Sequence, residues 1–348
     1  MLSLLRTQLR RAEALSRDTL DTLGFVGKSK VLRKLSLPGL AAFTRDLPRL
    51  RLGPHLGVLF HAHTRGTSEA IVCGGDRLSY QEFNQEINQL ARALAALGVC
   101  GGEGVALMLP NCIEHVVAQE TMARIGGIAV QIGSRLKSKE IAHILSDAGP
   151  QLLIYHYAYQ DEVLRAIQQS SFLAELEEAQ LVVVGAPSAA TPYGARYEEL
   201  IATQPTTMPS PLGNSDGGVI IYTSGTTGTP KGASRSWKDT DLFSVTDLMA
   251  QTGMRSDDRH LVVCPLYHSA AHAFTKMMTV LGATVVLAEH FDPEEVLYTI
   301  EAEGITSIFV VPTMLVRLNA LDSSIRHKYD TSSLRWVMSG AAPLSTST

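Results

Sequence analysis

Residues 104–132 read GVALMLPNCIEHVVAQETMARIGGIAVQI, and the pattern inside this stretch decides the fold class. The apolar run 104–109 ends at Pro110, which predicts a short buried strand. Residues 112–124 predict a helix that Gly126 and Gly127 stop, and residues 128–132 predict a second strand. Strands that alternate with helices of this length predict a parallel sheet covered on both faces.

The same alternation continues on both sides of this stretch. Ser79 and Glu82 form a capping box that predicts the start of a helix, and Gly98 predicts its end. Further strands are predicted at residues 152–155, 181–184, 218–222, 261–264, 284–288, 307–311 and 334–338. Further helices are predicted at residues 139–147, 159–170, 241–252, 270–281, 293–303 and 313–321. We therefore predict an α/β fold with two consecutive α/β subdomains and mainly parallel sheets.

The chain divides by composition into an N-terminal extension and a main domain. Residues 1–54 are basic and amphipathic, and residues 55–348 carry the α/β pattern. Within the main domain we expect subdomains at about 55–185 and 217–348. Residues 186–216 are rich in Pro, Ala, Ser, Thr and Gly, which predicts a linker between them.

Composition excludes several classes of protein. Of the 348 residues, 45% are hydrophobic and 18% are charged, which is typical of a folded soluble protein and not of a disordered one. The four cysteines form no CxxC pair, so we expect reduced thiols and a cytoplasmic location. No apolar run approaches the ~20 residues that a membrane-spanning helix needs.

The N-terminal segment differs in charge from the rest. Residues 1–52 hold eleven Lys and Arg against four Asp and Glu, a net charge of +7, whereas the whole chain carries −4. Leucines recur between these charges at an approximately helical spacing, at Leu2, Leu5, Leu9, Leu20 and Leu23. Three interpretations stay open: a helix in peripheral contact with an anionic membrane through residues 1–52, a helix docked on the main body, and a mitochondrial presequence.

Residues 222–232 read YTSGTTGTPKG and directly follow a predicted buried strand. Glycines allow backbone N–H groups to approach a phosphate, hydroxyls add donors, and Lys231 adds a positive charge. In open α/β sheets the ligand crevice lies at the carboxyl ends of strands, so this loop is a candidate polyanion site. It does not match a Walker A loop, because Pro230 stands where the second glycine belongs and Gly232 follows the lysine. The structural alternative is a surface turn.

YTSGTTGTPKG resembles the phosphate-binding signature of the adenylate-forming superfamily, which includes acyl-CoA synthetases and aryl-CoA ligases. Four further stretches agree in order: residues 78–111, CPLYHSAAHAF (264–274), VVPTM (310–314) and SGAAPLS (339–345). The resemblance covers about residues 55–348. It implies the incomplete large N-terminal domain of an adenylate-forming enzyme.

The resemblance also implies an activity. The family activates a carboxylic acid with ATP and Mg²⁺ to an acyl-adenylate and then transfers the acyl group to coenzyme A. By resemblance, the phosphates of ATP contact Thr223, Ser224, Gly225, Thr226, Thr227, Gly228 and Lys231. Adenine packs on the turn formed by Gly340, Ala341, Ala342 and Pro343. The catalytic candidates are Lys231, which offsets phosphate charge, and His268, which borders the acid and adenylate site.

Histidine side chains can also serve as metal ligands or as structural residues. His268 has the alternative of a partly buried structural histidine, since catalytic roles depend on geometry. His268 and His272 are one helical turn apart, but no HExxH motif or third ligand accompanies them, and we predict no metal site in the protein itself. We interpret His61 and His63 as loop residues.

The acid is predicted to have a neutral tail. Amino-acid-activating members of the family place an aspartate in the acyl-pocket segment, but residues 268–278 contain no acidic residue. Phe274, Met277 and Met278 suit a fatty or aryl pocket, although core packing explains them equally well. The basic N-terminus favours a fatty acid, with an aryl acid as the alternative, and no nucleic-acid partner is expected.

Several family motifs have no counterpart before Thr348. By resemblance these are a magnesium ligand, an aspartate that holds the ribose, and a small C-terminal domain with a catalytic lysine. We therefore expect a truncated relative with little or no ligase activity alone. The competing hypothesis is a noncatalytic nucleotide-binding or interaction module.

Overall fold

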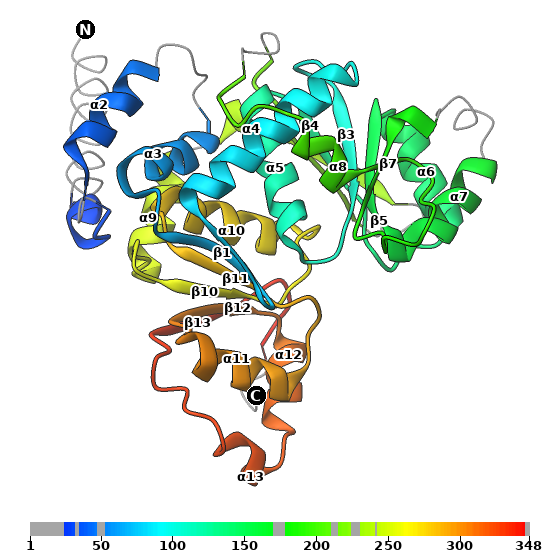
Figure 1. Ribbon diagram of the computed structural model, residues 1–348. Coiled ribbons are helices and arrows are strands. Elements are labelled where there is room, and N and C mark those ends of the chain that lie inside the picture. The colour runs from blue at the N-terminus through cyan, green and yellow to red at the C-terminus, as the bar shows by residue number, and fades with distance from the viewer. Residues whose placement is uncertain are drawn as a thin grey trace, which may run out of the picture.

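The computed structural model describes residues 24–31, 35–46, 53–169, 178–209, 215–223, 230–240 and 242–344. These residues form two sheets with helices packed around and between them (Figure 1). The prediction of an α/β fold with mainly parallel sheets is confirmed.

The first sheet has seven strands in the order β7-β6-β5-β3-β4-β8-β9. Its strands are β3 (Gly104–Met108), β4 (Ile128–Gln131), β5 (Leu152–His156), β6 (Leu181–Val184), β7 (Ala195–Arg196), β8 (Gly218–Thr223) and β9 (Lys231–Ser236). Every neighbouring pair is parallel except β8 and β9, which form an antiparallel hairpin. We call this the seven-stranded sheet.

The second sheet has six strands in the order β13-β12-β10-β11-β1-β2. Its strands are β1 (Glu69–Cys73), β2 (Asp76–Ser79), β10 (Arg259–Val262), β11 (Thr284–Leu287), β12 (Ser307–Val310) and β13 (Trp336–Ser339). Only β2 is antiparallel to its neighbour. We call this the six-stranded sheet.

Helices follow most strands. They are α2 (Leu37–Asp46), α3 (His55–Arg65), α4 (Tyr80–Ala96), α5 (Ile113–Ile125), α6 (Ser138–Ala148), α7 (Gln160–Gln169), α8 (Tyr197–Ala202), α9 (Leu242–Thr252), α10 (Ser269–Leu281), α11 (Pro293–Glu303), α12 (Pro312–Asn319) and α13 (Ser323–Arg326). Three short 3₁₀ turns are η2 (Tyr157–Tyr159), η4 (Glu178–Gln180) and η5 (Trp237–Asp239). The predicted capping box starts α4: the Glu82 backbone N–H donates to Ser79 Oγ over 3.2 Å, and the Ser79 N–H donates to Glu82 Oε2 over 2.8 Å.

The two sheets do not follow the predicted subdomains. β1 and β2 precede the seven-stranded sheet in sequence but belong to the six-stranded one, where Ile71 lies beside Val285. β8 and β9 lie beyond residue 217 but complete the seven-stranded sheet. The division into consecutive units at 55–185 and 217–348 is therefore wrong for the strands, because pairing between distant segments overrides chain order.

The predicted linker at 186–216 contains regular structure. Its described part includes β7, which extends the seven-stranded sheet, and α8, which packs against α4. Strand β9 was also not predicted. Its sequence KGASRS lacks an apolar alternation because the strand lies exposed at the sheet edge.

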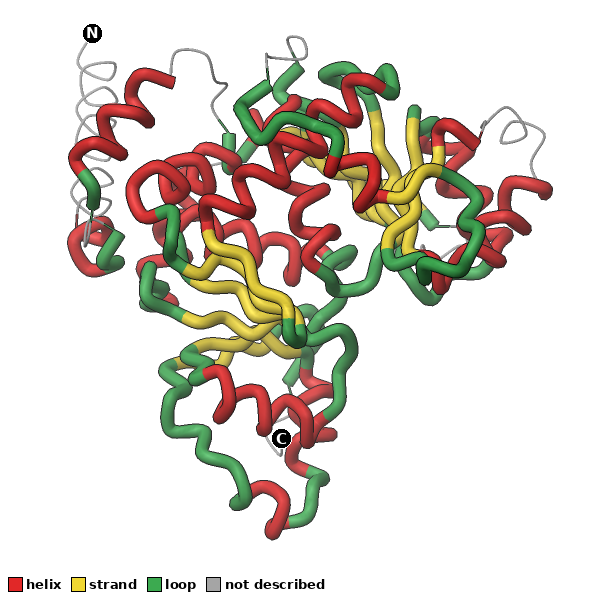
Figure 2. The backbone as a smooth tube through the Cα atoms, viewed as in Figure 1, coloured by secondary structure: helices red, strands yellow, loops and turns green. Residues whose placement is uncertain are grey.

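Helices α5 and α10 lie between the two sheets (Figure 2). Residues 115–125 of α5 are all buried, so this helix has no solvent face. One continuous apolar cluster includes side chains of both sheets and both helices. One face of each sheet therefore packs into this shared cluster, whereas the other face of the seven-stranded sheet packs with α6 and α7 in a second cluster.

The described pieces of the N-terminal extension dock on the main body. Phe25 is buried, the Ser256 N–H donates to the Ser29 carbonyl over 2.8 Å, and Lys30 pairs with Asp257. Helix α2 packs on α3. The five leucines that suggested an amphipathic helix lie outside the described residues. Within the described ranges, no helix is both long enough and apolar enough to cross a membrane.

Candidate functional site

Asn111 joins the carboxyl edges of the two sheets. It follows β3, and its buried amide donates to the carbonyls of Cys264 (3.1 Å) and Ala288 (2.9 Å), which follow β10 and β11. Asn111 Oδ1 accepts from the Leu266 backbone N–H over 2.8 Å. Because ligands of open α/β sheets bind at the carboxyl ends of strands, this junction is the candidate site.

Two further contacts close the same junction. The Gln119 side chain on α5 donates to the Leu266 carbonyl over 3.4 Å. Gly133, just after β4, lies so near Tyr267 that an added Cβ would be 3.4 Å from the tyrosine ring. The segment after β4 and the segment after β10 therefore face each other directly.

The candidate phosphate loop connects the two strands of a β-hairpin, β8 and β9. Thr223 ends β8 and pairs with Lys231, which begins β9. β8 runs parallel to β4, so the hairpin end lies at the carboxyl edge of the seven-stranded sheet. The predicted contacts from Ser224 to Gly228 lie outside the described residues. The described chain after the loop begins as strand β9 at Lys231, so an anion there would be bound by backbone N–H groups, hydroxyls and Lys231.

Helix α6 holds both ends of this hairpin. The Tyr222 hydroxyl donates to Asp147 Oδ2 over 2.6 Å, and His143 Nε2 donates to the Pro230 carbonyl over 3.1 Å. Burial, followed by the hydrogen bond to Asp147 and then its charge, raises the pKa of Tyr222, so its hydroxyl stays a donor. Sequence reasoning missed both α6 residues, because neither stands in a motif and both lie about 80 positions before the loop.

His268 lies at the same edge, directly before α10. Its ring centroid is 4.5 Å from that of Tyr267, and the side chain remains accessible. Partial burial of the ring and then the positive charge of Arg135 lower the pKa of His268. The imidazole is thus neutral at neutral pH and can both donate and accept a hydrogen bond.

The candidate adenine turn follows β13 at the carboxyl edge of the six-stranded sheet. The Gly340 N–H donates to the Val310 carbonyl over 3.3 Å, and an added Cβ on Gly340 would lie 3.4 Å from the Phe309 ring. Ala341 has a φ of 66°, in the left-handed region that favours glycine. An L-residue there costs about 1–2 kcal/mol. The turn from Ala341 to Pro343 is exposed.

The predicted pocket residues on α10 lie in the core. Phe274 stacks on Phe309 with ring centroids 4.8 Å apart. Met278 is fully buried, and Met277 is 7% exposed. Their packing is explained without a ligand.

A group of polar side chains, buried except for half-buried Trp237, lies beneath the edge. We call it the buried polar cluster, and its members are His115, Gln119, Gln131, Trp237, His272 and Thr275. Five of them carry buried atoms without a hydrogen-bond partner: both ring nitrogens of His272, Trp237 Nε1, Thr275 Oγ1, Gln119 Oε1 and Gln131 Nε2. Leaving one buried polar group unpaired costs about 1–3 kcal/mol. No local pattern predicts this arrangement, since the residues come from α5, β4, η5 and α10.

His272 is the centre of the buried polar cluster. Its ring stacks on Trp237 with a 5.9 Å centroid separation and an interplanar angle of 15°. Burial holds the pKa of His272 well below its usual range, and nearby Lys276 and His115 lower it further. The ring is therefore neutral, with one nitrogen that donates and one that accepts.

His115 connects the buried polar cluster to β4. Its Nδ1 lies 3.0 Å from the Pro110 carbonyl oxygen, and its Nε2 lies 2.9 Å from Gln131 Oε1. Burial lowers the pKa of His115, so the ring is neutral and its single N–H donates to one of these two oxygens. Gln131 Nε2 has no hydrogen-bond partner.

One buried ion pair lies next to this cluster. Lys276 Nζ lies 2.9 Å from Glu120 Oε2, with both side chains buried. The Thr279 hydroxyl is 3.2 Å from the other oxygen of Glu120. The described ranges contain no group of three or more His, Cys, Asp or Glu side chains suited to a metal ion.

The interpretation of His61 and His63 as loop residues is wrong. Both lie in α3, which the sequence pattern did not predict. His61 Nε2 donates to the Val280 carbonyl over 2.9 Å, and burial, followed by Arg65, lowers its pKa to about 3. His61 thus joins α3 to α10 as a neutral structural residue.

Known proteins resemble this chain over most of its length. A feruloyl-CoA synthase from Amycolatopsis sp. is 32% identical over 298 residues, which cover 85% of this chain and 53% of that protein. A long-chain-fatty-acid–CoA ligase from Mycobacterium tuberculosis is 31% identical over 271 residues, covering 77% and 50% respectively. The inhibitor-bound N-terminal domain of FACL13 from Mycobacterium tuberculosis superposes with a TM-score of 0.71 at 26% identity, over 85% of this chain and 72% of that one.

The chain spans about half the length of the curated relatives it matches. The family model for AMP-binding enzymes matches residues 60–348, the range that forms both sheets and the junction between them. The chain belongs to the AMP-binding enzyme family.

Proposed function

We propose that this chain binds ATP and a carboxylic acid at the junction of the two sheets, and contributes to acyl-adenylate formation. In that reaction a carboxylate oxygen attacks the α-phosphorus, the bond from that phosphorus to the bridging oxygen breaks, and pyrophosphate leaves. The thiol of coenzyme A then attacks the acyl carbonyl and releases AMP. Membership of the AMP-binding family and the names of the ligase relatives support this proposal.

The observation that carries the proposal is the set of three hydrogen bonds made by Asn111. The candidate phosphate loop leaves the seven-stranded sheet, and the candidate adenine turn leaves the six-stranded sheet. Asn111 ties the carboxyl edges of these sheets together. One nucleotide can thus be held by loops that belong to different sheets.

Each predicted site residue then has a chemical role. Lys231 and Thr223, with the loop between them, would bind the β- and γ-phosphates and offset charge that repels the incoming carboxylate. The turn from Gly340 to Pro343 would pack on adenine. Neutral His268 would orient the carboxylate through a hydrogen bond.

Mg²⁺ would enter this arrangement together with ATP, because the described ends of the hairpin loop, Thr223 and Lys231, supply no carboxylate. It is usually bound by one or two carboxylates, several waters and the phosphates of the substrate. When bound with ATP, it would neutralise phosphate charge. The chain's own contribution is the hairpin loop and Lys231.

The acid itself is proposed to have a neutral tail. The relatives are named for an aryl acid and for long-chain fatty acids. The basic N-terminal segment favours a fatty acid and peripheral contact with a membrane through residues 1–52, and an aryl acid is the alternative.

Calorimetry with ATP and Mg²⁺ tests the phosphate assignment. We expect Lys231→Ala to weaken binding by roughly tenfold, since it removes a charge-assisted contact to phosphate. Lys238→Ala is the matched control, because Lys238 is exposed but stands in η5 beyond the hairpin. Equal affinities of the Lys231→Ala variant and the unmodified protein would contradict the assignment.

Pyrophosphate exchange into ATP, run with fatty and aryl acids, tests catalysis. The expectation that residues 1–348 alone have little or no ligase activity stays a prediction, which robust exchange would refute. A stable acyl-sulfamoyl mimic of the acyl-adenylate separates the two hypotheses. An adenylating site binds it more tightly than AMP, whereas a noncatalytic nucleotide module binds both alike.

A further inference from the structure

We propose that helix α6 positions the candidate phosphate loop, and that Asp147 and His143 are the positioning residues through which it acts. This inference rests on the proposed function and deepens it, because it names the part of the chain that fixes where the β- and γ-phosphates would lie. The two side chains act through Tyr222 and Pro230 and would not touch the nucleotide.

The end of the β8–β9 hairpin projects beyond its neighbour in the seven-stranded sheet. The described pairing between β4 and β8 ends with Gln131 beside Ile221. Tyr222 and Thr223 continue past this point and pair with β9, which is the edge strand. A two-stranded hairpin is marginally stable by itself. Contacts from outside the sheet therefore have to fix the direction of this end.

Helix α6 supplies these contacts. His143 and Asp147 are four positions apart, so their side chains are neighbours on one side of the helix. His143 Nε2 donates to the Pro230 carbonyl over 3.1 Å, and Asp147 Oδ2 accepts from the Tyr222 hydroxyl over 2.6 Å. The Tyr222 ring lies against Gly232, where an added Cβ would be 3.1 Å from its Cζ atom. The ring thus connects α6 to both strands of the hairpin.

Helix α6 is itself firmly held. Ile141, Ile144 and Leu145 are fully buried in the apolar cluster that α6 shares with α7. At the start of α6, the Ser138 backbone N–H donates to Glu162 Oε2 of α7 over 3.0 Å. Side chains on a regular, well-packed element hold a site more precisely than side chains on loops do. The helix is therefore a suitable support for the hairpin end.

The chain that leads into α6 borders the acid side of the candidate site. Gly133 lies against Tyr267, where an added Cβ would be 3.4 Å from the ring. The Leu136 N–H donates to the Gly133 carbonyl over 3.1 Å, so a tight turn joins this contact to α6. His268 follows Tyr267. A shift of the hairpin end relative to α6 is consequently also a shift relative to the place where His268 would hold the carboxylate.

The charge of Asp147 is unfavourable for α6 itself. Asp147 lies exposed in the last turn, where the helix dipole disfavours an acidic side chain. Positions that break such a local rule are expected at functional sites. In Asp147→Ala, relief of this repulsion opposes the loss of the hydrogen bond. We therefore expect the melting temperature to change by less than about 2 °C.

The experiment compares the binding of ATP with Mg²⁺ and the binding of AMP by calorimetry. AMP lacks the β- and γ-phosphates, so a displaced phosphate loop should weaken the binding of ATP alone. We expect Asp147→Ala and Tyr222→Phe each to lower the affinity for ATP by roughly fivefold and to leave the affinity for AMP unchanged. Because both variants break the same hydrogen bond, the double variant should lose no more than either single one. His143→Ala should lower the ratio of ATP to AMP affinity as well.

Asp161→Ala is the matched control. Asp161 is an exposed aspartate in the first turn of the neighbouring helix α7. We expect its removal to change neither affinity. The melting temperature of each variant checks that the fold is intact.

Four outcomes would overturn the inference. If Asp147→Ala and Tyr222→Phe bind ATP as tightly as the unmodified protein while Lys231→Ala binds it weakly, the proposed function stands and α6 does not position the loop. If the affinity for AMP falls as much as that for ATP, α6 supports the fold as a whole. If the two single losses add in the double variant, the residues do not act through their hydrogen bond. If the unmodified protein binds neither nucleotide, this inference fails together with the proposed function.

Discussion

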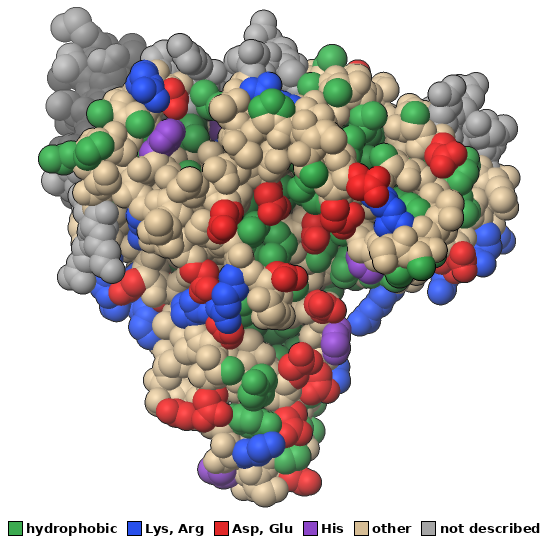
Figure 3. Space-filling model, viewed as in Figure 1, with side chains coloured by type: hydrophobic (Ala, Val, Ile, Leu, Met, Phe, Trp, Pro, Cys, Tyr) green, Lys and Arg blue, Asp and Glu red, His purple; other side chains and the backbone are tan. Residues whose placement is uncertain are grey.

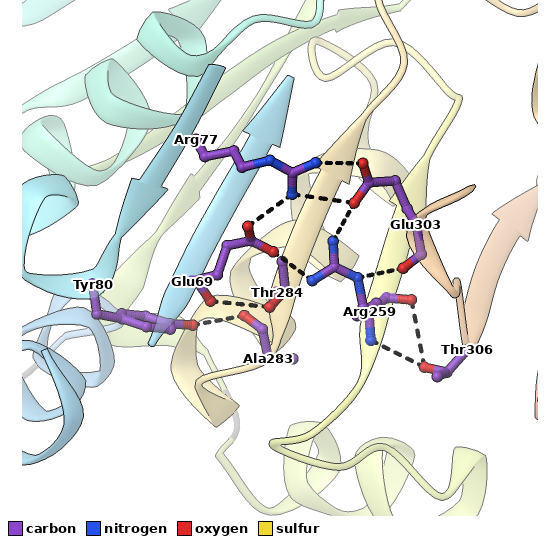
Figure 4. A network of polar contacts seen from close by, with 8 residues as sticks. All are labelled: Glu69, Arg77, Tyr80, Arg259, Ala283, Thr284, Glu303 and Thr306. Carbon is purple, nitrogen blue, oxygen red and sulfur yellow. Dashed lines mark hydrogen bonds and ion pairs between the residues drawn. The ribbon is translucent and has the colours of Figure 1, made fainter. Parts of the chain in front are cut away.

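The amino edge of the six-stranded sheet and the buried polar cluster beneath its carboxyl edge differ in how polar groups are paired. At the amino edge, Arg77 and Arg259 each contact the carboxylates of Glu69 and Glu303, as Figure 4 shows. Beneath the carboxyl edge, neutral donors and acceptors such as those of His272 have no partner. The charged groups of the amino edge pair with one another, whereas several atoms of the buried polar cluster have no hydrogen-bond partner among the described residues.

The amino-edge network connects four elements. Arg77 on β2 lies 2.8 Å from Glu69 on β1 and 2.6 Å from Glu303 on α11, and Arg259 on β10 contacts both acids. Thr284 Oγ1 donates to the Glu69 carbonyl over 3.0 Å. On the face drawn in Figure 3, acidic and basic side chains are likewise interspersed among the described residues. Such pairing fixes β1 and β2 against strands that follow them by almost 200 residues.

The contrast is local to these two regions. Unpaired buried atoms also occur at Asn84, Arg124 and Tyr197. Two described non-glycine residues have a positive φ: Lys30, which pairs with Asp257 before β10, and Ala341, after β13 on the carboxyl side.

The largest expected effect comes from breaking the buried ion pair next to the cluster. Glu120→Gln leaves Lys276 buried without a carboxylate, and we expect the free energy of unfolding to fall by roughly 3 kcal/mol or more. Urea unfolding measures it. Replacing both partners, as in Glu120→Gln with Lys276→Met, should restore much of the loss, because no charge then stays buried. A loss below about 1 kcal/mol in the single variant would show that the pair is not needed for the fold.

A smaller decrease in the free energy of unfolding is expected for a substitution at the amino edge. Glu69→Gln keeps the shape of the side chain but weakens its hydrogen bonds to two arginines, and we expect a cost of about 2 kcal/mol at pH 7. Glu295→Gln is the control, because Glu295 is exposed and only 3.6 Å from His290 in a surface pair worth less than about 0.5 kcal/mol. If Glu69→Gln and Glu295→Gln lower the free energy of unfolding equally, the amino-edge network contributes no more than an ordinary surface pair.

The lowered pKa of Glu69 predicts that its contribution to the free energy of unfolding depends on pH. Burial raises the pKa of Glu69, but the hydrogen bonds and charges of Arg77 and Arg259 outweigh it and bring the pKa below its ordinary value of 4.5. The folded state therefore holds the ionised form more strongly than the unfolded state does. The stabilisation by Glu69 is complete above pH 4.5 and is lost as pH falls below that value. The difference between the unmodified protein and Glu69→Gln should shrink accordingly in acid unfolding.

Local patterns were sufficient to predict most elements. Residues 104–132 fold into β3, α5 and β4, because the apolar runs are short and Gly126 ends the helix in a left-handed conformation with a φ of 71°. The capping box of α4 is present as predicted. These features depend on contacts within a few residues, which a sequence displays directly.

Features that depend on distant contacts were not predictable. Asn111 reads as a turn residue after Pro110, yet its partners are 153 and 177 positions away. Nothing near β1 indicates that it pairs with β11, or that β9 closes the seven-stranded sheet. The unpaired state of His272 could not be inferred either, since it depends on which side chains surround it. The site residues chosen by resemblance stay predictions until binding is measured.

The smallest expected effect tests the strain at the candidate adenine turn. Ala341→Gly removes a Cβ that costs about 1–2 kcal/mol at a φ of 66°, but a glycine also gives the unfolded chain about 0.4–1 kcal/mol more conformational freedom. We expect a net stabilisation of roughly 0.5 kcal/mol by urea unfolding. Ala342→Gly is the matched control: Ala342 has no positive φ, so only the unfolded-state term acts and the variant should lose stability. If both substitutions destabilise alike, the turn stores no strain, and the carboxyl side differs from the amino edge only in its unpaired side chains.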